Sequence, residues 1–86
     1  MALLSIPEIA SKEEIEEFHR QIGQNVKQAR LAKGVSQLEL SLVIGQKSAA
    51  FMSRAENGSA KTHFNLEQLY KIAKALGVEI QGLLPS

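Results

Sequence analysis

Three segments of this 86-residue sequence carry the pattern that begins α-helices. Residues 11–14 and 36–39 read Ser-x-x-Glu, and residues 65–68 read Asn-Leu-Glu-Gln. In such a capping box the first and fourth side chains bond backbone N–H groups that the helix would otherwise leave free. The segments that follow end at glycines, which commonly close helices: Gly34, Gly45 and Gly77. These start and stop signals predict a chain of short helices.

Apolar residues between these signals recur at three- and four-residue steps, as on one face of a helix. The first helix is expected at about 12–33, where Gly23 allows a break or a bend, with one stripe formed by Ile15, Phe18, Ile22, Val26 and Ala29. The second is expected at 37–44, and the third at 49–56 with Ser48 as its cap. The fourth spans 66–76, and its inner face is expected to hold Leu66, Leu69, Ala73 and Leu76. Residues 78–84 are expected to form a last short helical turn. Because no segment shows strand alternation, the predicted fold is all-α with five helices.

Length and composition limit the class of protein. A chain this short buries about 60% of its unfolded surface, which suits one small domain. It has no cysteine, so disulfides and thiolate metal sites are excluded. No stretch approaches the roughly 20 apolar residues that span a bilayer, and the apolar start lacks a basic leading segment. These features predict a cytoplasmic protein with an N-terminal extension at 1–20, helical from 11, and a domain at 21–84.

The net charge of +1 is unevenly distributed along the chain. Residues 1–20 hold five glutamates against Lys12 and Arg20, a net charge of −3. Residues 21–86 hold eight bases against four glutamates, a net charge of +4. The excess of lysine and arginine in residues 21–86 is compatible with contacts to nucleic-acid phosphates, although a solvated helical face has a similar composition.

Residues that could support catalysis or metal binding have simpler interpretations. The glutamates at 13, 14, 16 and 17 open a helix, where acids interact favourably with the helix dipole. Catalysis would instead need a carboxylate polarised in a cleft. His19 has no cysteine or second histidine at metal-ligand spacing, and His63 is expected to be a loop residue, with a phosphate contact as the alternative. The sequence therefore predicts a protein that is not an enzyme and needs no cofactor.

The order and spacing of short motifs resemble the lambda-repressor/Cro-type, or xenobiotic-response-element, family of helix-turn-helix regulators. The matching segments are Ile22-Gly23, Ala29-Arg30, residues 33–40, Gly45, Ser48, residues 52–58 and residues 66–78. Together they cover roughly residues 21–84. The resemblance implies a compact five-helix domain that binds duplex DNA as a homodimer and regulates transcription, most simply as a repressor, with the third helix in the major groove.

The resemblance also implies roles for individual residues. Arg30 and Glu56 are expected to form a structural salt bridge between the first and third helices. Arg54 is the base-reading residue able to make a bidentate contact to guanine. The full predicted DNA-binding set is Gln37, Lys47, Ser48, Ala49, Ala50, Ser53, Arg54, Asn57 and Lys61. Within it, Gln37 and Asn57 form the phosphate clamp, and Lys47 and Lys61 are additional phosphate partners.

Several features leave alternatives open. The turn at 45–48 is one residue longer than usual in the family, so the third helix is either displaced or starts earlier. Ser41 replaces a small apolar residue, and Phe51 either packs in the core or contacts DNA. Tyr70, with Leu83 and Leu84, belongs either to the core or to a dimer seam. The rival functions are an antitoxin that binds a toxin protein, a restriction-system controller, and a protein-interaction module without DNA binding.

Overall fold

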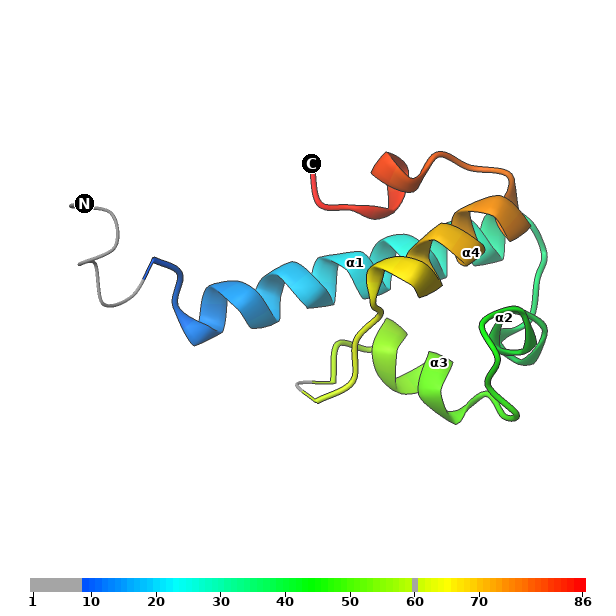
Figure 1. The fold of residues 1–86 in the computed structure, drawn as a ribbon, viewed down its shortest axis with the longest axis horizontal. Helices are drawn as coiled ribbons and strands as arrows, with labels where there is room; N and C mark the ends of the chain where they lie inside the picture. The colour runs from blue at the N-terminus through cyan, green and yellow to red at the C-terminus, as the bar shows by residue number, and fades with distance from the viewer. Residues whose placement is uncertain (1–8, 60) are drawn as a thin grey trace.

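The computed structural model describes residues 9–59 and 61–86, and within these ranges every regular element is a helix (Figure 1). The elements are α1 (Lys12–Ala32), α2 (Gln37–Val43), α3 (Ala50–Glu56), α4 (Leu66–Leu76) and the 3₁₀ turn η2 (Ile80–Leu83). The all-α prediction is confirmed, but the described chain has four α-helices and not five. The last segment forms only a 3₁₀ turn, because Gly82 and Pro85 disfavour a longer helix there.

The three capping boxes form as the sequence predicts. The Ser11 hydroxyl accepts the Glu14 N–H at 3.0 Å, and the Glu14 carboxylate accepts the Ser11 N–H at 3.1 Å. The boxes that begin α2 and α4 have the same reciprocal bonds. The backbone N–H and hydroxyl of Ser36 also lower the pKa of the Glu39 carboxylate, because both hydrogen bonds favour its charged form.

One core joins all the helices. Its buried side chains are Ile22, Val26, Leu40, Ile44, Met52, Ala55, Phe64, Leu69, Ile72, Ala73, Leu76 and Leu83. The predicted inner face of α4 is therefore largely correct, but the assignment of Leu66 to it is wrong. Leu66 is the first residue of α4 and is 73% exposed, whereas Leu69 and Leu76, farther along the helix, are buried in the core.

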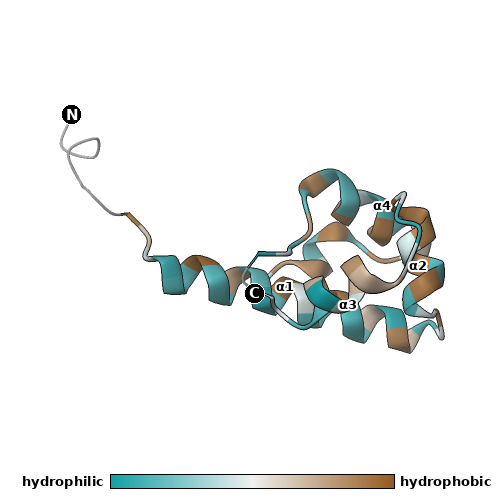
Figure 2. Ribbon diagram, turned by 90° about the horizontal axis from the view of Figure 1, so that it is seen from below, coloured by the Kyte–Doolittle hydropathy of each residue, from teal (hydrophilic) through white to brown (hydrophobic). Residues whose placement is uncertain are grey.

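The first half of helix α1 extends beyond the core that the other helices form with it. Figure 1 shows its first half extending beyond the other elements, and Figure 2 shows apolar bands on this uncovered part. Ile22 and Val26 are buried, whereas Ile15 and Phe18 are 48% and 46% exposed. The apolar stripe predicted for this helix thus continues past the protein's own core.

Gly23 allows α1 and α3 to approach closely. The helix runs through this position without a break, so glycine is not needed here for a bend. A Cβ atom at Gly23 would instead overlap the Ala55 carbonyl oxygen and lie 3.1 Å from the Glu56 carbonyl oxygen. Both carbonyl oxygens belong to the backbone of α3. The lack of a side chain at Gly23 therefore allows the two helices to pack this closely.

Replacing Ser41 with alanine is expected to raise the free energy of unfolding by about 1 kcal/mol. The Ser41 side chain is fully buried, and its hydroxyl has no hydrogen-bond partner among the described residues. Alanine removes the unpaired polar group at nearly the same volume. Ser36→Ala is the control, because loss of that cap should lower stability by about the same amount. Urea denaturation measures both changes, and a destabilised Ser41→Ala protein would show that the hydroxyl has a partner in solution.

Candidate nucleic-acid interface

The turn between α2 and α3 positions the third helix. Gly45 has a φ of 83°, a left-handed conformation that glycine adopts without strain. The prediction that Ser48 caps the helix is wrong, because Ala49 occupies the cap position and no side chain caps α3; the Ser48 hydroxyl accepts only the Ala50 N–H, at 3.3 Å. The helix begins at Ala50, one residue later than predicted. The turn therefore takes up its additional residue before the helix starts.

Helix α3 is anchored by one apolar side. Met52 and Ala55 are almost completely buried. The Phe51 ring is half-buried and meets the Phe64 ring edge-on, with 5.8 Å between ring centroids. The structure thus gives Phe51 a packing role. These three contacts leave the opposite side of α3 uncovered.

A buried ion pair fixes the end of α3 to α1. The Arg30 guanidinium donates Nε and Nη2 to the two Glu56 carboxylate oxygens at 2.7 and 3.0 Å, and Nη1 to the Val35 carbonyl oxygen at 2.9 Å. The Gln37 amide donates to the same carboxylate at 3.1 Å. The Glu56 side chain has no exposed surface and that of Arg30 has 7%. One carboxylate therefore connects α1, the start of α2 and the end of α3.

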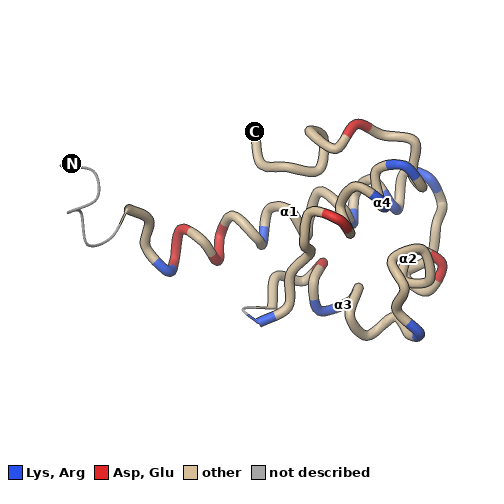
Figure 3. Tube along the Cα trace, viewed as in Figure 1, with Lys and Arg blue, Asp and Glu red and all other residues tan. Residues whose placement is uncertain are grey.

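The residues assigned to DNA by sequence lie at the start of α2, in the α2–α3 turn, on α3 and in the segment that follows it. Arg54, Ala50 and Asn57 are exposed, while Ser53 and Ala49 are half-buried. Gln37 lies at the first position of α2 and Asn57 directly after α3, so these two residues flank the helix. Lys47 and Ser48 are exposed in the α2–α3 turn, and Lys61 is exposed in the connection to α4, farther along the chain. Figure 3 shows acidic bands on the first half of α1, and further acidic positions on α2, at the end of α3, on α4 and in the segment after it.

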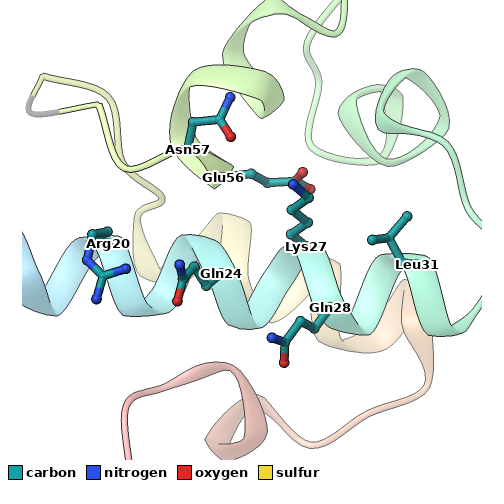
Figure 4. A pocket seen from close by; sticks show the side chains of 7 residues that line it. All are labelled: Arg20, Gln24, Lys27, Gln28, Leu31, Glu56 and Asn57. Atoms are coloured by element: carbon teal, nitrogen blue, oxygen red, sulfur yellow. The ribbon is translucent and has the colours of Figure 1, made fainter.

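A cleft of about 390 Å³ lies beside Asn57, between α1 and the end of α3 (Figure 4). Its lining from α1 consists of Arg20, Gln24, Lys27, Gln28 and Leu31. Sequence reasoning did not assign these residues to the interface, although positions 20, 24, 27, 28 and 31 share one helix face. Arg20 is engaged by Glu17, and this contact, together with a hydrogen bond from Gln21, lowers the pKa of the Glu17 carboxyl to about 2.

A stacked histidine pair holds the connection between α3 and α4 against α1. The His19 and His63 rings are nearly parallel, with centroids 3.8 Å apart. The His19 Nδ1 atom is buried without a hydrogen-bond partner among the described residues. Desolvation, and then the proximity of His63, lowers the pKa of His19 below its usual 6.5. No group of three or more candidate metal ligands occurs in the described part of the chain.

This pair predicts that stability falls as the pH drops below about 6.5. Because the folded chain binds a proton at His19 less readily than the unfolded chain, protonation favours unfolding. The contribution of neutral His19 to folding stability is complete above the pKa that His19 has in the unfolded chain. It decreases as the pH falls through that pKa toward the lower pKa of the folded chain. Thermal melts between pH 7.5 and 5.5 should show a falling midpoint for the wild type and a flatter profile for His19→Gln. Identical profiles would contradict this role of His19.

A family model described as helix-turn-helix matches residues 26–83 of the chain. The matched range contains α2, α3, the turn between them and α4, together with the Arg30–Glu56 pair. This chain belongs to the helix-turn-helix family. The curated proteins contain no match to the chain.

Solved structures resemble this helix-turn-helix protein over most of its length. The restriction-modification controller protein C.AhdI from Aeromonas hydrophila is 29% identical, with a TM-score of 0.65, over 76% of this chain and 94% of that one. The DNA-binding domain of BldD is 25% identical, with a TM-score of 0.67, over 81% and 97%. HppE with Co(II) and substrate is 25% identical, with a TM-score of 0.68, over 79% of this chain and 36% of its own.

These comparisons confirm the resemblance to lambda-repressor/Cro-type regulators. Transcriptional regulation through the helix-turn-helix is the function that they support. Among the described residues, no helix is both long and apolar enough to cross a membrane.

Proposed function

We propose that this protein binds duplex DNA with α3 in the major groove and regulates transcription by occupying its site, acting as a repressor. The observation that carries the proposal is the buried Arg30–Glu56–Gln37 network. It holds the end of α3 rigidly against α1 while the outward side of α3 stays uncovered. A short helix presented in this way fits the major groove of B-DNA.

The contacts divide into positioning and reading groups. Gln37 and Asn57, on the two flanks of α3, bind phosphates and set the register, with Lys47 and Lys61 as further phosphate contacts. The Gln37 amide keeps its carbonyl oxygen and a second N–H after bonding Glu56. Lys27, on α1 in the cleft beside Asn57, is a further phosphate contact. The reading group on and before α3 is Ser48, Ala49, Ala50, Ser53 and Arg54.

Affinity requires two copies of the domain. The part of the chain after residue 20 has a net charge of only +4, so one copy neutralises few phosphates and binds weakly at physiological salt. A symmetric homodimer would read two half-sites about one helical turn apart. The protein is thus expected to select a two-fold-symmetric sequence.

A controller of a restriction-modification system is the second candidate. Its support is the likeness to C.AhdI, which this chain covers over 94% of that protein's length. Such a controller would bind DNA in the same way but near the promoter of restriction genes. Footprinting on the DNA that flanks its own gene distinguishes the two candidates, because a general regulator has no need of adjacent restriction genes.

Arg54→Ala is expected to lose base preference, with a loss of discrimination of about 1–3 kcal/mol at the contacted base pair. Gln37→Ala should instead weaken binding to all sequences alike, because a phosphate contact carries no sequence information. Fluorescence anisotropy on a duplex chosen from a random pool, and on its single-base variants, measures both. If Arg54→Ala keeps the wild-type preference, the base-reading assignment is wrong.

A further inference from the structure

The first half of α1 presents an apolar stripe that its own chain leaves largely uncovered. Ile15 and Phe18 are about half exposed, and they continue the line of Ile22 and Val26, which are buried. This half of the helix lies before residue 26, where the family match begins. We call Ile15 and Phe18 the uncovered stripe. It is the kind of surface that marks an interaction site.

An apolar groove adjoins the uncovered stripe. A cavity of about 470 Å³ is lined mainly by apolar side chains, namely Phe18, Ile22, Phe64, Leu66, Leu69 and Leu84. A second cavity of about 350 Å³, beside Ile15, shares His19 and His63 with the first. We call the larger cavity the α1–α4 groove. Leu66, the exposed leucine at the start of α4, forms part of its wall.

We propose that a second copy of this chain covers these surfaces. The uncovered stripe of each copy packs into the α1–α4 groove of its partner, so that one two-fold axis relates two identical contacts. The chain carries both parts of such a contact, an apolar helix face and an apolar groove, and Phe18 lies where the two meet. Its two parts also have opposite charge, −3 over residues 1–20 and +4 over residues 21–86, which favours docking of one copy's extension on the other copy's body.

This interface is compatible with DNA binding. Figure 1 shows α3 and the C-terminal segment on opposite sides of α1, and Leu84 of that segment lines the α1–α4 groove. Dimerisation there leaves the outward side of α3 free. The inference rests on the proposed function only for the need of a dimer, and the interface can be tested without DNA. The rival seam is the outer face of α4, where Tyr70 is 58% exposed.

The test is sedimentation equilibrium of the full chain, without DNA, over a concentration series. The wild type is expected to dimerise, and Phe18→Asp to raise the dimer dissociation constant about tenfold or more. Leu42→Asp is the matched control, because Leu42 is 59% exposed on α2 and does not line the groove. Circular dichroism melts establish that each variant folds. Should Phe18→Asp unfold, Leu66→Asp tests the groove from its other wall.

Each outcome decides the proposal. Dissociation by Phe18→Asp or Leu66→Asp, with Leu42→Asp still dimeric, supports the stripe-in-groove interface. Dissociation by Tyr70→Asp alone assigns the dimer to the outer face of α4 and overturns it. A wild type that stays monomeric up to about 100 µM also overturns it. DNA binding by the same samples is scored separately, so failure of the interface and failure of the proposed function give different results.

Discussion

Replacing Arg30 with methionine is expected to lower the free energy of unfolding by about 3–5 kcal/mol. The substitution leaves the Glu56 carboxylate, which has no exposed surface, with only the Gln37 amide as a partner. A buried charge that loses its counter-ion keeps its full desolvation cost. Because small domains are stable by only about 5–15 kcal/mol, much of the fold's stability would be lost. Urea denaturation measures the change.

A double variant separates the ion pair from the packing of its side chains. Arg30→Met combined with Glu56→Leu removes both charges, so it should recover most of the lost stability. Lys71→Met is the surface control, because the Lys71–Glu67 pair is exposed and should contribute less than about 1 kcal/mol. A loss below about 1 kcal/mol for Arg30→Met would mean that the pair does not hold α3 in place.

Gly23→Ala is expected to lower the free energy of unfolding by about 3 kcal/mol, although alanine is the better helix former by about 1 kcal/mol. The added methyl group would overlap the Ala55 carbonyl oxygen. This oxygen belongs to the backbone of α3, so relief requires moving the whole helix. The displaced helix should also bind its DNA less tightly, because the phosphate and base contacts would no longer fit together.

Gly82→Ala provides the matched control for this position. A Cβ atom at Gly82 has no neighbour within 4 Å, and its φ is not positive. The free energy of unfolding of this variant should therefore lie within about 0.5 kcal/mol of the wild-type value. If thermal melts show Gly23→Ala to be as stable as Gly82→Ala, the close packing of α1 on α3 is not a feature of the protein in solution.

The local features of the fold could be read from the sequence. The capping boxes at Ser11, Ser36 and Asn65 depend on residues three positions apart, and all three form. The buried positions Leu69, Ala73 and Leu76 of α4 follow from helical periodicity in the same way. Motif order allowed the family to be recognised, because spacing along the chain preserves which residues meet in the helix-turn-helix.

Features set by contacts between distant segments could not be read in this way. Helical propensity alone predicts a break or a bend at Gly23, whereas the need for glycine there comes from the Ala55 carbonyl oxygen, 32 positions along the chain. The stacking of His19 on His63 and the exposure of Leu66 depend on how the first half of α1 lies against the connection that leads into α4. The cleft that includes Lys27 forms only when α3 packs on α1.

Selection from a random duplex pool by the wild-type protein tests the central claim most directly. At low salt the protein should enrich a two-fold-symmetric site, and its binding should weaken steeply as salt rises, because phosphate contacts release counter-ions. Enrichment of such a site supports a regulator that reads DNA with α3. If no sequence is enriched even at low salt, the fold serves another role, and the two alanines at the start of α3 belong to a protein-binding surface.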